Sequence, residues 1–325
     1  MRVFLFRNEK MKKRSEKRRE QEGKMVFTSY DKKQIFIREW ARTEDPVGVV
    51  QIAHGMNEYA ARYNAFAERL NELGYIVVAD DHRGHGDTDS ETLGYSEGDM
   101  FDDTLKDMAG IAKMYREKYT GLKYVLFGFS YGSFLTQAFL ERYGHYIDGA
   151  IIAGSSRQNG AAVTVGRMVS ALGGAIKGKD APAKFVNGLV FGGYDKKIGE
   201  GEWQWLSTNR ESNDKYREDP FCNFICSYNF FSGFFKGLSG LYKNANAQKL
   251  DTEMPVLLIS GADDPVGGTA GVERLFSFYK RCGMKRVRKV LLEGGRHEFL
   301  NEPEHFEEAF REIAAFLKNV SRRSR

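Results

Sequence analysis

The chain has 325 residues, of which 42% are hydrophobic and 13% aromatic, a composition typical of a globular protein with one large core. No apolar run approaches 18 residues, so we expect no transmembrane helix. The net charge of +5 comes from the two ends, because residues 1–24 contain ten Lys or Arg against four Glu, and four more basic residues follow from Lys318 onward. The rest of the chain is mildly acidic, which excludes a basic nucleic-acid-binding surface on the folded body.

The N-terminal residues 1–24 lack apolar periodicity, and we interpret them as a basic, flexible extension. A contact between these charges and anionic lipid is the alternative. The three cysteines, Cys222, Cys226 and Cys282, form no Cys-x-x-Cys pair, and no histidine lies near the first two. They predict reduced thiols in a cytoplasmic protein and exclude a zinc site or a disulfide framework.

From residue 25 onward, short apolar segments alternate with amphipathic ones. A strand-like segment opens at Met25, and further strands are expected at 34–40, 47–53, 75–79, 124–127, 150–153, 256–259 and 287–292. Helices are expected at 59–73, 102–119, 134–143, 272–282 and 306–317. This alternation predicts an α/β fold with a mostly parallel, doubly wound sheet, formed by residues 25–157 and 249–325.

The alternation breaks between residues 158 and 248. This stretch is rich in glycine and aromatic residues, and it is too long for a loop inside a compact domain. We therefore predict an inserted helical cap, or lid, that covers the end of the sheet. Its phenylalanines, among them Phe230, Phe231, Phe234 and Phe235, either pack the cap onto the sheet or line a pocket for an apolar group.

The segment Gly128-Phe129-Ser130-Tyr131-Gly132 lies between an expected strand and an expected helix. A serine at such a strand–turn–helix junction is held in a strained turn and exposed at the edge of the sheet, and the two glycines allow the close crossing of strand and helix. Gly-x-Ser-x-Gly alone is a weak motif, but this context makes Ser130 the candidate nucleophile.

A serine hydroxyl needs a general base, and the base needs an acid to orient it. Of the six histidines, His297 follows the last expected strand and precedes the last expected helix, which is where this arrangement places the base. Two carboxylates, Asp263 and Asp264, follow an earlier strand and precede Pro265. We favour Asp264 over Asp263 as the acid, with a role as a turn residue as the alternative for either.

The developing oxyanion needs two backbone N–H donors. We expect one from Tyr131, which follows the nucleophile, and one from Met56, in the loop after an early strand. In this interpretation His54 shapes that loop, and the turn that contains His82 and His85 supports it. The two turn histidines have no Asp, Glu or Cys grouping that would complete a metal site, so we expect no metal and no cofactor.

Five motifs in this order resemble the monoacylglycerol lipase/lysophospholipase-like branch of the α/β-hydrolases, which is of the serine aminopeptidase S33 type. The motifs are His54–Glu58 with Arg62-Tyr63, Asp81–Gly86, Gly128–Gly132, Gly261–Pro265 and Gly295–Glu298. The resemblance covers about residues 26–318. It implies an α/β-hydrolase fold with an eight-stranded sheet, a helical cap and hydrolysis of carboxylic esters without a cofactor. It also supports Asp264, because the acid of this family precedes the proline.

The sequence therefore predicts a serine esterase that forms an acyl-enzyme on Ser130. We expect its substrate to be a small acyl ester, of the monoacylglycerol, lysophospholipid or other short- to medium-chain type. A transient contact with a membrane surface, through the cap or the basic N-terminus, is left open. The alternatives are a peptidase or amidase of the same fold and a non-catalytic hydrolase-like binding protein.

Overall fold

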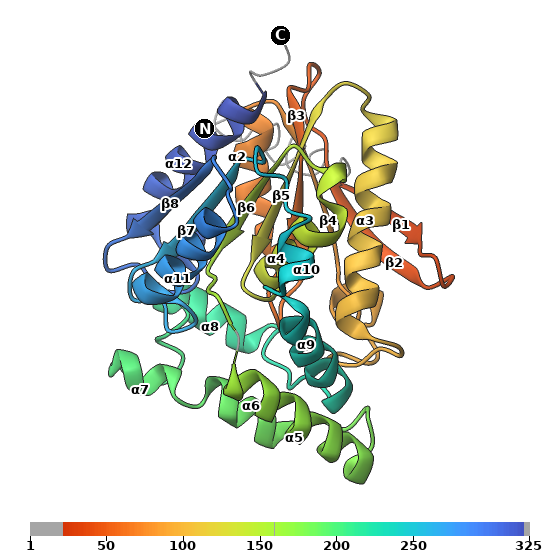
Figure 1. Ribbon diagram of the computed structural model, residues 1–325, viewed down its shortest axis with the longest axis vertical. Coiled ribbons are helices and arrows are strands. Elements are labelled where there is room, and N and C mark those ends of the chain that lie inside the picture. Colours follow the sequence, from red (N-terminus) through yellow and green to blue (C-terminus); the bar gives the residue numbers. More distant parts are fainter. Residues whose placement is uncertain (1–21, 159, 322–325) are drawn as a thin grey trace, which may run out of the picture.

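The computed structural model describes residues 22–158 and 160–321. It contains an eight-stranded sheet with the strand order β1-β2-β4-β3-β5-β6-β7-β8 (Figure 1). The strands are β1 (Glu22–Thr28), β2 (Gln34–Trp40), β3 (Gly48–Ala53), β4 (Tyr75–Asp80), β5 (Lys123–Phe129), β6 (Gly149–Ala153), β7 (Val256–Gly261) and β8 (Val287–Leu292). All pairs from β4 to β8 are parallel, and β2 is antiparallel to both of its neighbours. This sheet confirms the predicted fold class.

Helices cover both faces of the sheet. The described α-helices are α2 (Asn64–Glu72), α3 (Met100–Lys118), α4 (Tyr131–Tyr143), α5 (Ala161–Lys177), α6 (Lys184–Phe191), α7 (Tyr194–Ile198), α8 (Arg210–Glu218), α9 (Tyr228–Gly240), α10 (Asn244–Ala247), α11 (Gly268–Arg281) and α12 (Pro303–Ser321). One core cluster joins the sheet to α3, α4 and α11, and a second joins it to α2 and α12. The molecule is thus doubly wound, as the alternation of apolar segments predicts.

The predicted elements are present, with shifted ends. Strand β1 begins at Glu22, inside the segment predicted as an extension, and residues 1–21 lie outside the described residues. Helix α4 begins at Tyr131 and not at Phe134 as expected, because Ser130 itself is the residue before the first helical turn. Among the described residues, no helix is both long and apolar enough to cross a membrane.

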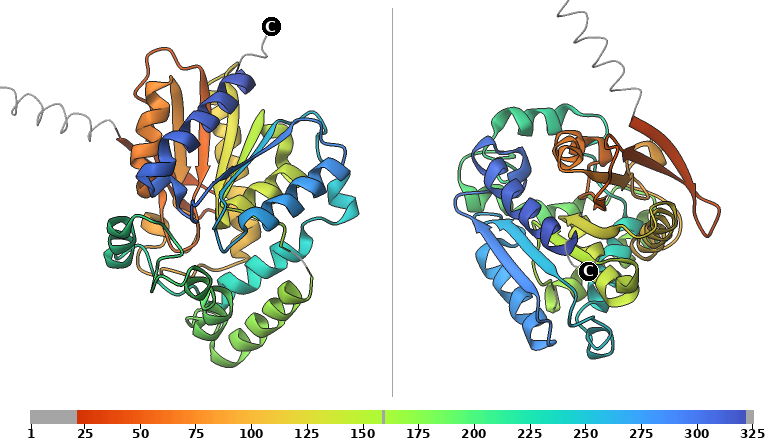
Figure 2. Two further views of the ribbon diagram at one scale, coloured as in Figure 1. Left: turned by 90° about the vertical axis from the view of Figure 1, so that its left-hand side faces the viewer. Right: turned by 90° about the horizontal axis from the view of Figure 1, so that it is seen from above.

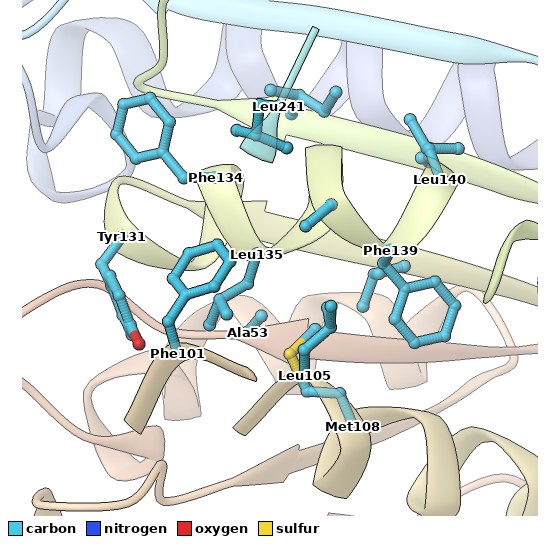
Figure 3. Close-up of a cluster of buried hydrophobic side chains, with 14 of the residues drawn as sticks. Ala53, Phe101, Leu105, Met108, Tyr131, Phe134, Leu135, Phe139, Leu140 and Leu241 are labelled. Atoms are coloured by element: carbon cyan, nitrogen blue, oxygen red, sulfur yellow. The ribbon is translucent and has the colours of Figure 1, made fainter. Parts of the chain in front are cut away.

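Helix α4 lies in the centre of the larger core cluster. It packs in front of β5 and beside α3, and Figure 3 shows the side chains from these two helices that come together: Phe101, Leu105, Met108, Tyr131, Phe134, Leu135, Phe139 and Leu140. Burying a side chain of this size contributes about 1.5–3 kcal/mol to stability. Helix α4, which directly follows Ser130, is therefore among the firmly held parts of the molecule.

The chain between β6 and β7 leaves the sheet and forms α5 to α10. Figures 1 and 2 place α5 and α6 at one end of the molecule, beyond the sheet. Helix α9 packs against α3, and α5 packs against α9. Gly166 and Gly173 allow the close approach of α5, because a Cβ atom on either would collide with the ring of Phe235 or Tyr228. The residues predicted as a cap, 158–248, include these helices, and their role as a cap stays a prediction.

Candidate active site

Ser130 lies in the sharp turn between β5 and α4. Its backbone has φ 51° and ψ −115°, a conformation that non-glycine residues rarely adopt and that costs free energy. The backbone N–H of Ser130 donates to the carbonyl oxygen of Ala153 on β6, 3.0 Å away, which anchors the turn. A Cβ atom at Gly128 or Gly132 would collide with neighbouring backbone, so this turn requires both glycines. Ser130 is half-buried and lies at the end of β5.

His297 contacts Ser130 from the loop after β8. Its Nε2 is 2.9 Å from Ser130 Oγ, and its Nδ1 is 2.9 Å from Asp264 Oδ2. When Nδ1 carries the proton that faces Asp264, Nε2 is free to accept the hydroxyl proton of Ser130. Burial lowers the pKa of His297, but the charge of Asp264 and its hydrogen bond outweigh this effect, so the net pKa is raised. The imidazole is therefore a stronger base than an ordinary histidine.

The two adjacent carboxylates after β7 lie in different surroundings. Asp264 is buried, and besides His297 it accepts hydrogen bonds from the Ser260 hydroxyl at 3.2 Å and the Val266 N–H at 2.8 Å. Asp263 is exposed. Its backbone N–H donates to the carbonyl of Gly295, whereas the carboxylate that contacts the imidazole is that of Asp264. The structure thus brings Ser130, His297 and Asp264 together, in the order that the sequence suggested.

The loop after β3 runs directly beside Ser130, because a Cβ atom on Gly55 would lie 3.2 Å from that of Ser130. The N–H of Gly55 donates to Glu58 Oε1 at 2.6 Å, and the N–H of Asn57 donates to His85 Nε2 at 3.3 Å. Within the described chain, the N–H of Met56 between them has no intramolecular acceptor. It is therefore an amide of this loop that is available to a ligand.

The three histidines near this loop are buried and act as hydrogen-bonding groups. His54 Nε2 accepts from the N–H of His82, and His85 Nδ1 binds the carbonyl of Arg83. Burial lowers the pKa of His85 to about 3 and also lowers that of His54 well below its ordinary value. Both rings are neutral at physiological pH, which is what their acceptor roles require.

A buried ion cluster connects the loop at Met56 with the loop at His297. Arg62 donates to Glu58 Oε2 at 2.7 Å and to both carboxylate oxygens of Glu298 at 2.7 and 2.8 Å. Its guanidinium also lies 4.9 Å from the centre of the Tyr216 ring in the inserted segment. Our sequence interpretation assigned no role to Arg62 or Glu298. The i, i+4 spacing of Glu58 and Arg62 was the one local signal, and nothing local indicated Glu298.

Two cavities meet at Ser130. One has a volume of about 410 Å³ and is lined almost entirely by apolar side chains, including those of Phe234, Phe235 and Leu238. The other, of about 230 Å³, contacts His297 and has carboxylates and aromatic rings on its wall. We call them the apolar cavity and the polar cavity. Both alternatives for the phenylalanines hold, since Phe234 and Phe235 pack against the core and also line the apolar cavity.

The chain is similar to known proteins in sequence and in fold. The family model for the serine aminopeptidase S33 family matches residues 44–304.

The chain belongs to this family.

It is 27% identical to a monoacylglycerol lipase from Mycolicibacterium smegmatis, over 82% of this chain and 86% of that protein. It is 26% identical to the human monoglyceride lipase, over 87% of this chain and 86% of that protein. The crystal structure of a carboxyl esterase from Bacillus coagulans in complex with glycerol superimposes with a TM-score of 0.83 at 26% identity, covering 92% and 98% of the two chains. These relatives and the sheet topology make this S33 protein an α/β-hydrolase.

Proposed function

We propose that this protein hydrolyses carboxylic esters through an acyl-enzyme on Ser130. The observation that carries the proposal is the continuous hydrogen-bonded chain from Ser130 Oγ through His297 to Asp264 at the mouth of an apolar cavity. The names of the relatives, which include monoacylglycerol lipases and an esterase, support the same reaction. The proposed substrates are monoesters of fatty acids, of the monoacylglycerol or lysophospholipid type or with shorter chains.

The proposed reaction has two halves. Ser130 Oγ attacks the ester carbonyl carbon while His297 Nε2 takes its proton, and the N–H groups of Met56 and Tyr131 donate to the oxyanion that forms. His297 then returns the proton to the alcohol oxygen, and the alcohol leaves. A water molecule, activated by His297, attacks the acyl-enzyme and releases the acid. Asp264 holds the tautomer of His297 and stabilises its protonated form throughout.

The two cavities suggest which part of the substrate binds where. Among the described residues, the wall of the apolar cavity has no charged side chain, so it suits the hydrocarbon of the acyl group. The polar cavity contacts His297, which must reach the oxygen of the leaving alcohol. We therefore assign the acyl chain to the apolar cavity and the alcohol to the polar cavity.

We further propose that the inserted segment touches a lipid surface. Six large apolar side chains of α5 and α6 are between 53% and 71% exposed: Val165, Met168, Leu172, Ile176, Phe185 and Leu189. Val165 and Leu189 also line the apolar cavity, so the exposed face continues into the proposed acyl site. An insoluble monoester could pass from a membrane into the cavity along this face. The basic residues 1–21 lie outside the described residues and do not enter this argument.

The alternative of an aminopeptidase has less support. Such an enzyme cleaves after a residue with a free amino group, which needs an acidic partner on the acyl side of the nucleophile. Among the described residues, the apolar cavity has none, so this alternative would require the acyl group to bind in the polar cavity, beside Glu58, Asp195 and Glu298. A comparison of an octanoyl ester with aminoacyl nitroanilides separates the two readings, and faster cleavage of the anilides would contradict the esterase proposal.

Labelling with a fluorophosphonate probe tests the proposal directly. The intact protein should become labelled at Ser130, and the Ser130→Ala variant should not be labelled and should lose at least about 10⁴-fold in kcat. Circular dichroism of the variant checks that it is folded. Equal labelling of both proteins would refute the nucleophile, and unlabelled protein without esterase activity would refute the function.

A further inference from the structure

The wall of the polar cavity carries carboxylates and no cation. Glu58, Asp195 and Glu298 all contribute to it, and among the described residues no lysine or arginine does. Two of these acids, Glu58 and Glu298, bind Arg62 in the buried cluster. A phosphate-bearing alcohol in this cavity would thus meet acids and find no basic side chain.

One guanidinium does not neutralise this wall. Burial raises the pKa of Glu58, so burial favours the protonated, uncharged form of this carboxyl group. At Glu298 burial acts in the same direction, but the attraction of Arg62 outweighs it and lowers the pKa. Even with Glu58 protonated, the carboxylates of Glu298 and Asp195 stand against the single charge of Arg62, which leaves a net negative wall.

The basic residues closest to Asp195 in sequence do not change this balance. Lys196 and Lys197 are exposed and lie outside the lining of the cavity. Lys197 Nζ donates to the carbonyl of Pro265 at 3.3 Å. Arg296 is paired with the exposed Glu200 at 2.7 Å.

Aromatic rings form much of the remaining wall. The six Phe, Trp and Tyr rings that line the polar cavity are Phe129, Phe191, Trp203, Trp205, Tyr216 and Phe224. The Trp205 ring lies 5.3 Å from the His297 ring, and the backbone N–H of Trp205 donates to Asp195 Oδ1 at 3.4 Å. The faces of such rings attract cations, most strongly at tryptophan. The Asp195 carboxylate therefore contacts the backbone of Trp205, and the indole of Trp205 lies next to the catalytic candidate His297.

We propose that the polar cavity selects esters whose leaving alcohol is positively charged, such as a quaternary ammonium or amino alcohol, accepts neutral alcohols, and discriminates against phosphate-bearing ones. This inference rests on the proposed function, because it needs the alcohol to lie beside His297. The inference separates the substrate classes that the sequence analysis could not distinguish. Esters of glycerol and of amino alcohols fit the polar cavity, whereas esters of glycerophosphate do not. Asp195 is the specificity-determining residue, since its carboxylate is outside the Arg62 cluster.

The alternative to selecting the charge of the alcohol is that the carboxylates of this wall raise the basicity of His297. Both Glu58 and Glu298 raise the pKa of that imidazole. This effect would act on every ester equally, whatever the charge of its alcohol. Substrates of the same shape that differ only in charge therefore separate the two roles.

The test compares octanoylcholine with neohexyl octanoate, its uncharged isostere, and monooctanoylglycerol with its phosphate ester. We expect kcat/KM to be about tenfold higher for octanoylcholine than for the isostere at low salt, and this ratio to shrink at high salt. The phosphate should lower kcat/KM about tenfold. Asp195→Asn should reduce the choline preference about threefold, while Asp214→Asn, an exposed matched control on α8 paired with Arg217, should leave it unchanged.

The outcomes are distinguishable. Equal kcat/KM for the choline ester and its isostere, or for the glycerol ester and its phosphate, would overturn this inference while the esterase function stands. A choline preference that Asp195→Asn leaves intact would overturn the role of Asp195. If none of the esters is hydrolysed and the fluorophosphonate probe does not label Ser130, the proposed function itself fails.

Discussion

Helices α4 and α5 are both apolar, yet they are packed in opposite ways. Of the 13 residues of α4, 11 are buried, whereas only three of the 17 residues of α5 are. Helix α4 inserts its large side chains into the core beside Ser130 (Figure 3). Helix α5 approaches α9 closely at Gly166 and Gly173, and its large side chains Val165, Met168, Leu172 and Ile176 are exposed. The sheet end that contains Ser130 is thus packed into the core, whereas α5 leaves most of its large apolar side chains exposed.

This difference predicts two kinds of mutational effect. Changes at the ends of the strands should reduce the rate for every substrate, because they disturb the reacting groups. Changes in the inserted segment should depend on the substrate and on its physical state, because they alter what reaches Ser130. The following predictions proceed from the largest expected effect to the smallest.

Among changes at the ends of the strands, Asp264→Asn should have the largest effect on the rate. An amide would favour the wrong tautomer of His297, so we expect kcat to fall about 10³–10⁴-fold for long and short esters alike. The matched control is Asp263→Asn, which should change kcat less than about twofold, because Asp263 is exposed. Steady-state kinetics with soluble nitrophenyl esters measure both, and equal losses in the two variants would contradict our assignment of the acid.

The Gly166→Leu substitution tests whether the apolar cavity binds the acyl chain, because it adds a large side chain to the cavity wall. Gly166 lines the cavity, and a Cβ atom there would lie 2.5 Å from the ring of Phe235, so the larger side chain must displace that ring or fill the cavity. We expect KM to rise about tenfold for octanoyl esters and to change little for acetyl esters. Gly193→Ala, where an added Cβ meets nothing within 4 Å, is the control. A uniform loss for both esters would argue against an acyl site.

The exposed face of the inserted segment is tested with Leu172→Ser combined with Phe185→Ser. Removing two apolar side chains weakens partition onto lipid, so hydrolysis of monoacylglycerol in phospholipid vesicles should fall about fivefold. Hydrolysis of a dissolved ester should be unchanged. Val26→Ser, which removes a similarly exposed apolar side chain from β1, should have no effect on either. Vesicle co-sedimentation supplies the binding measurement, and unaltered binding of the double variant would contradict the membrane contact.

The smallest expected effect is a shift in the pH profile. Because the pKa of His297 is raised, kcat/KM should fall as the pH decreases through that raised pKa, since a protonated imidazole cannot accept the Ser130 proton. Glu298→Gln removes one of the charges that raise this pKa, so the acid limb should move to lower pH, by about half a unit. Glu304→Gln, at an exposed glutamate, should not move it. A shift to higher pH in Glu298→Gln would contradict this account.

Much of this protein could be predicted from local sequence. Short apolar runs indicated the strands of the sheet, and helical periodicity indicated the helices that cover it, because the residues of each element define which of its sides are buried. The strand–turn–helix context around Ser130 and the late loop at His297 suggested the site. The structure brings these residues together with Asp264, and their catalytic roles remain predictions that the variants above test.

Other features depended on contacts between distant residues, and only the tertiary structure decided them. Arg62 meets Glu298 across 236 positions of the chain, so no local pattern could have indicated the buried cluster. The apolar stripe of α5 would ordinarily be assigned to the core, but its small residues allow the closest approach to α9, and the large side chains remain outside. The sequence alone thus determined the elements and the order of the reacting groups, because these follow from local periodicity and turn chemistry. The tertiary structure decided the charge of the polar cavity and the outward face of α5, because both arise only where separate segments pack together.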